Sequence, residues 1–266
     1  MRRLALDGAV VVVTGAAGGL GAELSRQLAR RGARVALLDL ELGDLAQHVP
    51  GSRAWQVDVT DAAGLGRVAQ EVHAHFGRVD AVVVNAGIGH TGALLTMDPA
   101  AYERVIEVNL LGSVRTVRTF LPALVASRGH VLQIASLAAM VHAPLMSAYA
   151  ASKAGVEAMA HALRPELAPR GVTVGVGRGH HRGVGEGEVG DADPALKALR
   201  TGLPGPFGKT YPVAPAVARI VTGLQRRAPH VYAQGWLRVI AAVRGQAPGL
   251  VARQSAGPAA VAQGLT

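Results

Sequence analysis

The sequence predicts an α/β fold in which a doubly wound parallel β-sheet is flanked by helices on both faces. Short runs of aliphatic and β-branched residues alternate with longer segments of helical periodicity over the first two-thirds of the chain. These short runs are almost entirely apolar, as strands buried on both faces of a parallel sheet must be. A glycine-rich turn joins the first such run to the first helical segment.

The predicted elements follow one another in regular order. The strands are expected at residues 9–14, 34–39, 53–58, 79–84, 130–135 and 172–176, with a further short one at 230–233. The helices are expected at residues 20–31, 62–76, 99–127 and 148–168. No internal repeat or linker interrupts this order, so we expect one domain over residues 1–251. Residues 252–266 are mostly Ala, Gly, Gln and Pro without periodicity and predict a flexible tail.

The beginning of the chain superficially resembles a secretory signal, because two arginines precede an apolar run. Asp7 and Gly8 break that run, which then continues into the glycine turn, so a buried first strand is the better interpretation. No stretch reaches the roughly 18 apolar residues of a membrane span. We expect a cytoplasmic protein without an integral span.

The composition narrows the kinds of site that the chain can hold. There is no cysteine, which excludes disulfides, thiolate metal sites and cysteine nucleophiles, and we expect no metal. The net charge of +9 is typical of some nucleic-acid or membrane-surface proteins. However, aromatic residues make up only 3% of the chain and the arginines are scattered. We therefore expect no nucleic-acid partner.

The glycine turn, residues 14–21 with the sequence TGAAGGLG, lies between the first predicted strand and helix. In that position backbone N–H groups can approach a pyrophosphate at the positive end of the helix. The strict G-x-G-x-x-G spacing is absent, so the evidence lies in the turn's place in the fold. It predicts a Rossmann-type dinucleotide-binding domain.

Asp39 ends the second predicted strand and indicates which dinucleotide is bound. A carboxylate there can accept both hydroxyls of the adenosine ribose and would repel a 2′-phosphate. The turn contains no lysine or arginine to hold such a phosphate. NAD is therefore predicted over NADP. The less favoured alternative for Asp39 is a helix N-cap, and the two roles are compatible.

Ser136, Tyr149 and Lys153 form a pattern suited to proton transfer. Tyr149 and Lys153 are four residues apart on a predicted helix and share one face. A tyrosine with a pKa of about 10 is a poor base at neutral pH, and a nearby ammonium stabilises its phenolate. Ser136 closes the fifth predicted strand ahead of this helix.

With these motifs the chain resembles a short-chain dehydrogenase/reductase of the single-domain type of about 250 residues. The resemblance runs from residue 6 to residue 174 and rests on the turn TGAAGGLG, Asp58-Val59, Asp80 with Asn85-Ala86-Gly87, Asn109, Ser136 and the Tyr149/Lys153 pair. Val84 stands where the family usually has a second asparagine. The resemblance implies cofactor contacts from Gly15, Gly19, Leu20, Gly21, Asp39, Asp58, Val59, Asn85, Ala86, Gly87, Tyr149 and Lys153.

The same resemblance implies a catalytic role for four residues. Tyr149 would exchange the proton with the substrate oxygen, and Ser136 would orient that oxygen. Lys153 would bind the nicotinamide ribose and lower the pKa of Tyr149, while Asn109 would kink the fourth helix and hold a proton-relay water. The implied reaction interconverts a secondary alcohol and a ketone.

The substrate is expected to be a lipophilic small molecule, because mostly apolar residues are expected to line its pocket: Leu137, Met140, Val141, His142, Leu145 and Met146. Two other functions stay open. One is a non-catalytic NAD-sensing protein on the same fold, and the other is an NADPH-dependent 3-ketoacyl reductase acting on carrier-bound substrates.

The segment at residues 171–190 departs from the family pattern. It holds eight glycines, with His180 and His181 in its middle. The Pro-Gly pair and the following threonine, which in the family meets the nicotinamide amide, are both missing. A divergent mobile lid, an impaired enzyme and a local slip of reading frame each explain this. Two adjacent histidines on a loop make a poor metal chelate.

Two further expectations concern surfaces. The resemblance implies a homodimer or homotetramer paired through the fourth and fifth helices, and residues 105–117 are unusually apolar for a helix with one free face. Near the end of the chain, Trp236, Val239, Ile240 and Val243 form one apolar helical stripe. We expect this stripe to cover the active-site side or a subunit interface, with peripheral membrane contact as the alternative.

Overall fold

The computed structural model describes residues 3–179 and 211–243 and contains a seven-stranded, wholly parallel β-sheet. The strand order is β3-β2-β1-β4-β5-β6-β7, with a reversal of winding beside β1. The strands are β1 (Val10–Thr14), β2 (Arg34–Asp39), β3 (Arg53–Gln56), β4 (Ala81–Val84), β5 (His130–Ile134), β6 (Thr173–Arg178) and β7 (His230–Tyr232). This order confirms the predicted doubly wound α/β fold of the Rossmann type.

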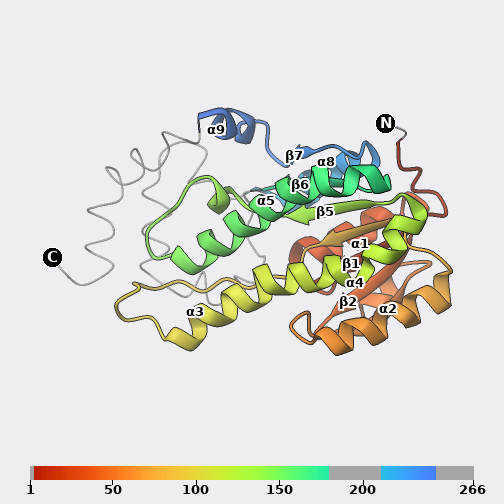
Figure 1. Cartoon of the computed structure of the whole chain (residues 1–266), viewed down its shortest axis with the longest axis horizontal. Coiled ribbons are helices and arrows are strands. Elements are labelled where there is room, and N and C mark those ends of the chain that lie inside the picture. The colour runs from red at the N-terminus through yellow and green to blue at the C-terminus, as the bar shows by residue number, and fades with distance from the viewer. Residues whose placement is uncertain (1–2, 180–210, 244–266) are drawn as a thin grey trace.

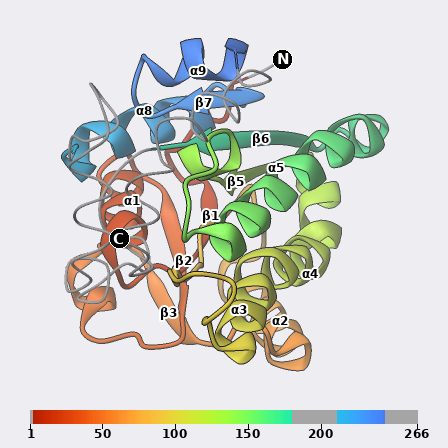
Figure 2. The ribbon, with the colours of Figure 1, turned by 90° about the vertical axis from the view of Figure 1, so that its left-hand side faces the viewer.

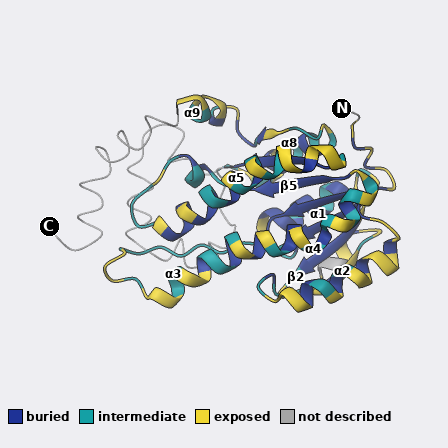
Figure 3. Ribbon diagram, in the orientation of Figure 1, coloured by how far each residue is buried: buried dark blue, intermediate teal, exposed yellow. Residues whose placement is uncertain are grey.

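Helices cover both faces of the sheet (Figures 1 and 2). On one face α1 (Gly19–Ala29) and α8 (Val213–Gln225) pack on alternate residues of β1, such as Val11 and Val13. On the other face α2 (Ala62–Phe76), α4 (Gly112–Ser127) and α5 (Ser147–Leu167) pack on Val10 and Val12. The apolar residues of the central strands therefore alternate between two apolar layers, and these strands are buried between them (Figure 3).

Some elements differ from their predicted bounds. The predicted helix at 99–127 consists of α3 (Pro99–Ile106), a π-helical turn (Glu107–Leu111) and α4. β6 continues two residues past its predicted end, to Arg178, because its glycines pair with β5 and β7. Helix α8 was not predicted at all. Short α9 (Leu237–Val243) follows β7.

The last helix does not present the predicted stripe. Leu237 is fully buried and packs with Leu137 and Met140, while Trp236, Ile240 and Ala241 border this cluster. Val239 and Val243, which were expected to point inward, are instead 64% and 46% exposed. The inward face is thus rotated by about one residue, and it lies against the segment that follows β5.

The parallel sheet brings the ends of distant strands to common edges. The carboxyl ends of β1, β2, β4 and β5 lie at one edge, where Gly15, Asp39, Asn85 and Ser136 follow or end them. Of the helices in residues 3–179 and 211–243, none is long and apolar enough to cross a membrane. The predictions for His180, His181 and residues 252–266 fall outside the described residues.

Candidate active site

The glycine turn is closely packed upon itself and upon the end of β4. Gly15 has a φ of 63°, and a Cβ added to it would lie 2.8 Å from the Cα of Ala86. A Cβ on Gly21 would collide with the carbonyl oxygen of Gly15. No other residue fits these two positions without moving the backbone. Gly18 has open space around it, so the outer side of the turn is free to receive a ligand.

Asn85 fixes the turn from the neighbouring strand. Its side-chain amide donates to the carbonyl oxygens of Thr14 at 3.0 Å and Gly15 at 2.9 Å. The backbone N–H groups of Asn85 and Ala86 both donate to the hydroxyl of Thr14. Asn85 Oδ1 is buried and has no hydrogen-bond partner among the described residues. Asn85 therefore shapes the turn and presents one unsatisfied acceptor.

The carboxylate of Asp39 faces the same turn. Its Oδ2 accepts a hydrogen bond from Ala17 N–H at 2.7 Å, and its Oδ1 accepts one from Leu40 N–H at 2.7 Å. Asp39 is half-buried at the end of β2. Asp39 does not serve as the helix N-cap that the sequence left as an alternative, because the N-cap of α1 is Gly18. Its carboxylate lies beside the predicted cofactor site.

Asp58 and Val59 follow β3 on the same side of the sheet. Partial burial would raise the pKa of Asp58, but hydrogen bonds from Thr60 and from the Arg104 guanidinium hold it below its usual value. The Arg104 contact is 3.0 Å long. Val59 is buried, and a Cβ added to Gly112 would strike its side chain. The pair thereby links the loop after β3 to α3 and to the first turn of α4.

Asn109 lies in the π-helical turn and is fully buried. Its Oδ1 accepts from Ile88 N–H at 2.8 Å, and its Nδ2 donates to the Ile88 carbonyl at 2.9 Å. Nδ2 also donates to Ser152 Oγ on α5 at 3.0 Å. The side chain therefore ties the loop after β4 to the helix that carries Tyr149 and Lys153. A π turn at this place agrees with the kink that the resemblance implied at Asn109.

Tyr149 and Lys153 share the inner face of α5, as their spacing predicted. Lys153 Nζ is 5.8 Å from the centre of the Tyr149 ring and donates to the Ile134 carbonyl at 3.2 Å. Lys153 is only 2% exposed, and this burial lowers its pKa to about 8. A Cβ on Gly87 would lie 3.0 Å from Asn109 Oδ1 and 3.2 Å from Lys153 Nζ. Gly87 thus borders Asn109 and Lys153, two of the four predicted catalytic residues.

Ser136 directly follows β5 and begins the short 3₁₀ turn Leu137–Ala139, against which α5 packs. Its Oγ accepts from Ala138 N–H at 3.2 Å. On either side of it, Ala135 N–H donates to the Gly177 carbonyl and Leu137 N–H to the Gly179 carbonyl. The end of β6 therefore holds the backbone that presents Ser136.

Apolar residues surround Tyr149. Val105 and Ala148 are buried beside it, and Ile88, Tyr102 and Met146 border the same cluster. Of the residues predicted to line a substrate pocket, Met146 lies in this cluster, whereas Leu137 and Met140 are covered by α9. Leu145 has a φ of 65°, unusual for a leucine, and its carbonyl accepts from Gly92 N–H. This bond joins the loops after β4 and β5.

Sequence reasoning missed an ion pair that braces this region. Arg178, at the end of β6, donates from Nε to Glu157 on α5 at 2.8 Å and from Nη2 at 2.7 Å. Both side chains are at most 5% exposed. Glu157 lies one helical turn after Lys153, but its partner Arg178 lies in the glycine-rich segment that departs from the family pattern, so the sequence did not indicate the ion pair. A buried arginine demands such a partner.

Comparison with known proteins identifies the family to which the chain belongs. The model of the short chain dehydrogenase family matches residues 9–177. The putative oxidoreductase SadH of Mycobacterium tuberculosis is 32% identical over 250 residues, covering 86% of this chain and 91% of that protein. Dehydrogenase/reductase SDR family member 7B of Bos taurus is 37% identical over 182 residues, which are 63% of this chain and 56% of the bovine protein.

Solved structures share the fold. A short chain dehydrogenase from Burkholderia cenocepacia J2315 in complex with NADP has a TM-score of 0.76 and 28% identity, covering 94% of this chain and 99% of that one. A 3-ketoacyl-(acyl-carrier-protein) reductase from Brucella melitensis complexed with NADH has a TM-score of 0.72 and 21% identity, covering 85% and 97%. With most of its length matched by the family model and by the mycobacterial relative, the chain belongs to the short-chain dehydrogenase/reductase family of oxidoreductases.

Proposed function

We propose that this protein transfers a hydride between NAD and an apolar secondary alcohol or ketone, with Tyr149 as the acid/base. The observation that carries the proposal is the juxtaposition of Tyr149 with buried Lys153, next to Gly87 and Asn109. Ser136 follows β5 at the same edge of the sheet. A phenol beside an ammonium suits proton exchange with a substrate oxygen.

The residues at the carboxyl edge fit a dinucleotide. The glycine turn opens helix α1, whose first N–H groups favour a pyrophosphate. The open space at Gly18 is consistent with a ligand on the outer side of the turn. Asp39 would accept the ribose hydroxyls and disfavour a 2′-phosphate. When bound, the nicotinamide supplies C4 as the hydride donor or acceptor.

In this reaction each of the four predicted catalytic residues has a separate role. Tyr149 gives a proton to the substrate oxygen during reduction and takes it back during oxidation. The Lys153 ammonium stabilises the phenolate, and Ser136 Oγ orients the substrate oxygen. The amide of Asn109 is occupied by Ile88 and Ser152, so we assign it the positioning of the loop after β4 against α5.

The side chains around Tyr149 support the choice of an apolar substrate. Val105, Ile88 and Met146 offer aliphatic surface, and Tyr102 adds an aromatic ring. A substrate carbon next to the reacting carbonyl would be in contact with these groups.

The test is an NADH-formation screen over secondary alcohols, including steroids and long-chain species. Tyr149→Phe should lower turnover by about 10²–10⁴-fold while NAD affinity stays within a few-fold, because only the transferable proton is removed. Tyr102→Phe is the matched control, since it removes a phenol from the same cluster, and it should retain turnover. Retained activity in Tyr149→Phe would disprove the acid/base assignment. NAD binding without any turnover would favour a non-catalytic sensor.

A further inference from the structure

A cleft of about 760 Å³ lies far from the residues described above. It is lined by residues that precede or begin strands, such as Ala9 before β1, Asp80 before β4 and Thr173 at the start of β6. In a parallel sheet these amino ends lie at the edge opposite to the carboxyl ends. The cleft and the candidate active site are therefore at opposite edges of the same sheet.

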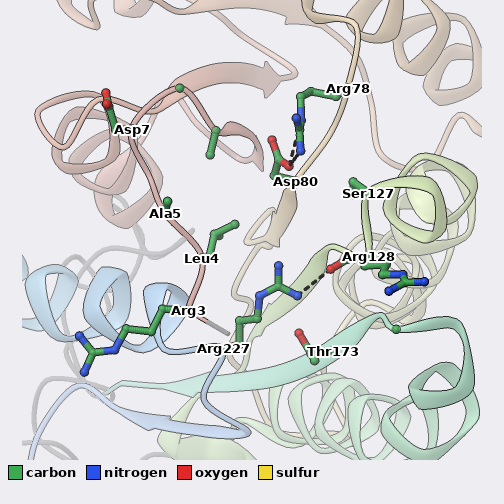
Figure 4. A pocket seen from close by; sticks show the side chains of 13 residues that line it. Arg3, Leu4, Ala5, Asp7, Arg78, Asp80, Ser127, Arg128, Thr173 and Arg227 are labelled. Atoms are coloured by element: carbon green, nitrogen blue, oxygen red, sulfur yellow. Dashed lines mark hydrogen bonds and ion pairs between the residues drawn. The ribbon is translucent and has the colours of Figure 1, made fainter. Parts of the chain in front are cut away.

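Arginines dominate the charge of this cleft. Arg3, Arg78, Arg128 and Arg227 line it, and they come from four separate segments of the chain (Figure 4). Its two carboxylates belong to Asp7 and Asp80. The Asp80 carboxylate is neutralised by Arg78, whose Nε donates to it at 3.0 Å, and it also accepts from Val10 N–H at 2.9 Å. The three other guanidinium groups and the Asp7 carboxylate leave the lining residues with an excess of two positive charges.

Arg227 lies in the middle of the cleft in Figure 4, and its Nη1 donates to the carbonyls of Arg128 at 2.6 Å and Gly129 at 3.2 Å. These bonds fix the guanidinium in place. Its Nε is shielded from solvent and has no hydrogen-bond partner among the described residues. The guanidinium is thus held at the centre of the cleft, where its positive charge favours an anion.

Two of the arginines occupy backbone positions that favour glycine. Arg128 follows α4 and Arg227 follows α8, and both have a φ of 50°. Glycine is the usual residue at such left-handed helix ends because a Cβ is costly there. Arginine does gain from the negative end of the helix dipole, but that gain is small at an exposed end. A further contribution from the two side chains would explain their presence at the rim of one cleft.

We propose that this cleft binds a small organic polyanion carrying at least two carboxylate or phosphoryl groups. Arg227 would hold one acid group at the centre, and Arg3 and Arg128 at the two ends of the cleft have exposed side chains that can turn toward another. Leu4 and Ala9 provide an apolar floor for the carbon skeleton. Among the described residues that line the cleft, none has an aromatic ring on which a nucleotide base would stack.

The proposal is tested by calorimetric titration of citrate and, separately, 2,3-bisphosphoglycerate at low ionic strength. The protein is saturated with NAD beforehand so that the glycine turn cannot bind the anion. We expect binding of at least one probe, whose identity shows whether carboxylate or phosphoryl groups are preferred. Failure of both probes to bind at about 10 mM would overturn the proposal.

Three variants locate the binding. Arg128→Gly should weaken it by about tenfold while leaving the melting temperature equal or higher, because glycine suits the left-handed position. Arg3→Gln should weaken it without affecting the fold. Arg67→Gln is the matched control, since it removes an equally exposed positive charge from α2, and it should bind as the wild type does. Equal weakening by all three would indicate net charge alone and would contradict a site in this cleft.

Discussion

At the scale of single residues, Asp39 is the side chain that we expect to set the preference between NAD and NADP. Its carboxylate lies against the glycine turn through Ala17 N–H, where an adenosine ribose would lie beside it. We predict that NAD binds more tightly than NADP. Asp39→Ser should narrow the ratio of the two dissociation constants, because it removes the repulsion of a 2′-phosphate. Asp44→Ser, at an exposed position further along the same loop, is the control. Equal affinities in the wild type would refute the assignment.

His130 gives the protein a dependence of stability on pH. It is fully buried at the start of β5, where burial, and then the charge of Arg227, lower its pKa to about 3. Because the folded pKa lies below the unfolded one, the neutral histidine contributes stability that is complete above about pH 6.5. This contribution is lost as the pH falls toward 3, by up to about 1.4 kcal/mol per pH unit.

The variant His130→Gln should flatten this dependence, because glutamine can keep the contact with Thr173 Oγ1, 2.7 Å from the histidine Nδ1, and does not titrate. The measurement is the free energy of unfolding in urea between about pH 6.5 and pH 4.5. His73→Gln removes an exposed histidine from α2 and should leave the slope unchanged. Identical slopes in all three proteins would show that His130 does not govern acid stability.

At the scale of elements, the sequence predicted most strands well, because an apolar run bounded by polar residues and glycine is a local signal. It failed where the structure depends on neighbours. The chain at Gly175 and Gly177 has weak strand preference, yet pairing with β5 and β7 extends β6 to Arg178. Helix α8 carries Pro215 in its first turn, and its apolar face is explained by packing on α1.

In the candidate site, too, local patterns in the sequence predicted some features, whereas contacts between distant segments were not predicted. Spacing alone placed Tyr149 and Lys153 on one face of a helix, and the structure agrees. The hold of Asn85 on the glycine turn and of Asn109 on Ile88 depends on segments 70 and 21 residues away, respectively. Likewise, nothing near Arg178 in the sequence indicates that Glu157 neutralises it. These contacts are set by the tertiary fold and carry no local pattern.

Helix α9 yields a prediction at this scale. Removing residues from Trp236 onward should expose Leu137 and Met140, which follow Ser136. We expect a melting temperature lower by several degrees and weaker substrate binding, since burial of each large apolar side chain contributes about 1.5–3 kcal/mol. A chain ending at Val243 keeps α9 and is the control. Unaltered activity and melting temperature, with lost sedimentation on anionic vesicles, would favour a membrane role instead.

At the scale of the whole molecule, exposed apolar side chains at the π-helical turn and the start of α4 lead us to expect an oligomer. Leu111 and Val114 are each 39% exposed on the helix predicted to pair with a second copy. We predict a homodimer or homotetramer by light scattering at micromolar concentration, and a smaller mass for Val114→Glu, because a charge cannot be buried there without a partner. Leu95→Glu, in an exposed loop, should leave the mass unchanged. A strictly monomeric wild type would contradict this prediction.

The π-helical turn at Glu107–Leu111 also determines how the two halves of one long helix are rotated relative to each other. A π turn amounts to one inserted residue, and each residue advances an α-helix by about 100°. Val105 on the first half faces Tyr149, and Phe120 on the second half faces the sheet core. Deleting a single residue from this turn would restore a regular helix and change its phase. Only one of these two contacts could then survive, so catalytic geometry and core packing cannot both be satisfied by an uninterrupted α-helix.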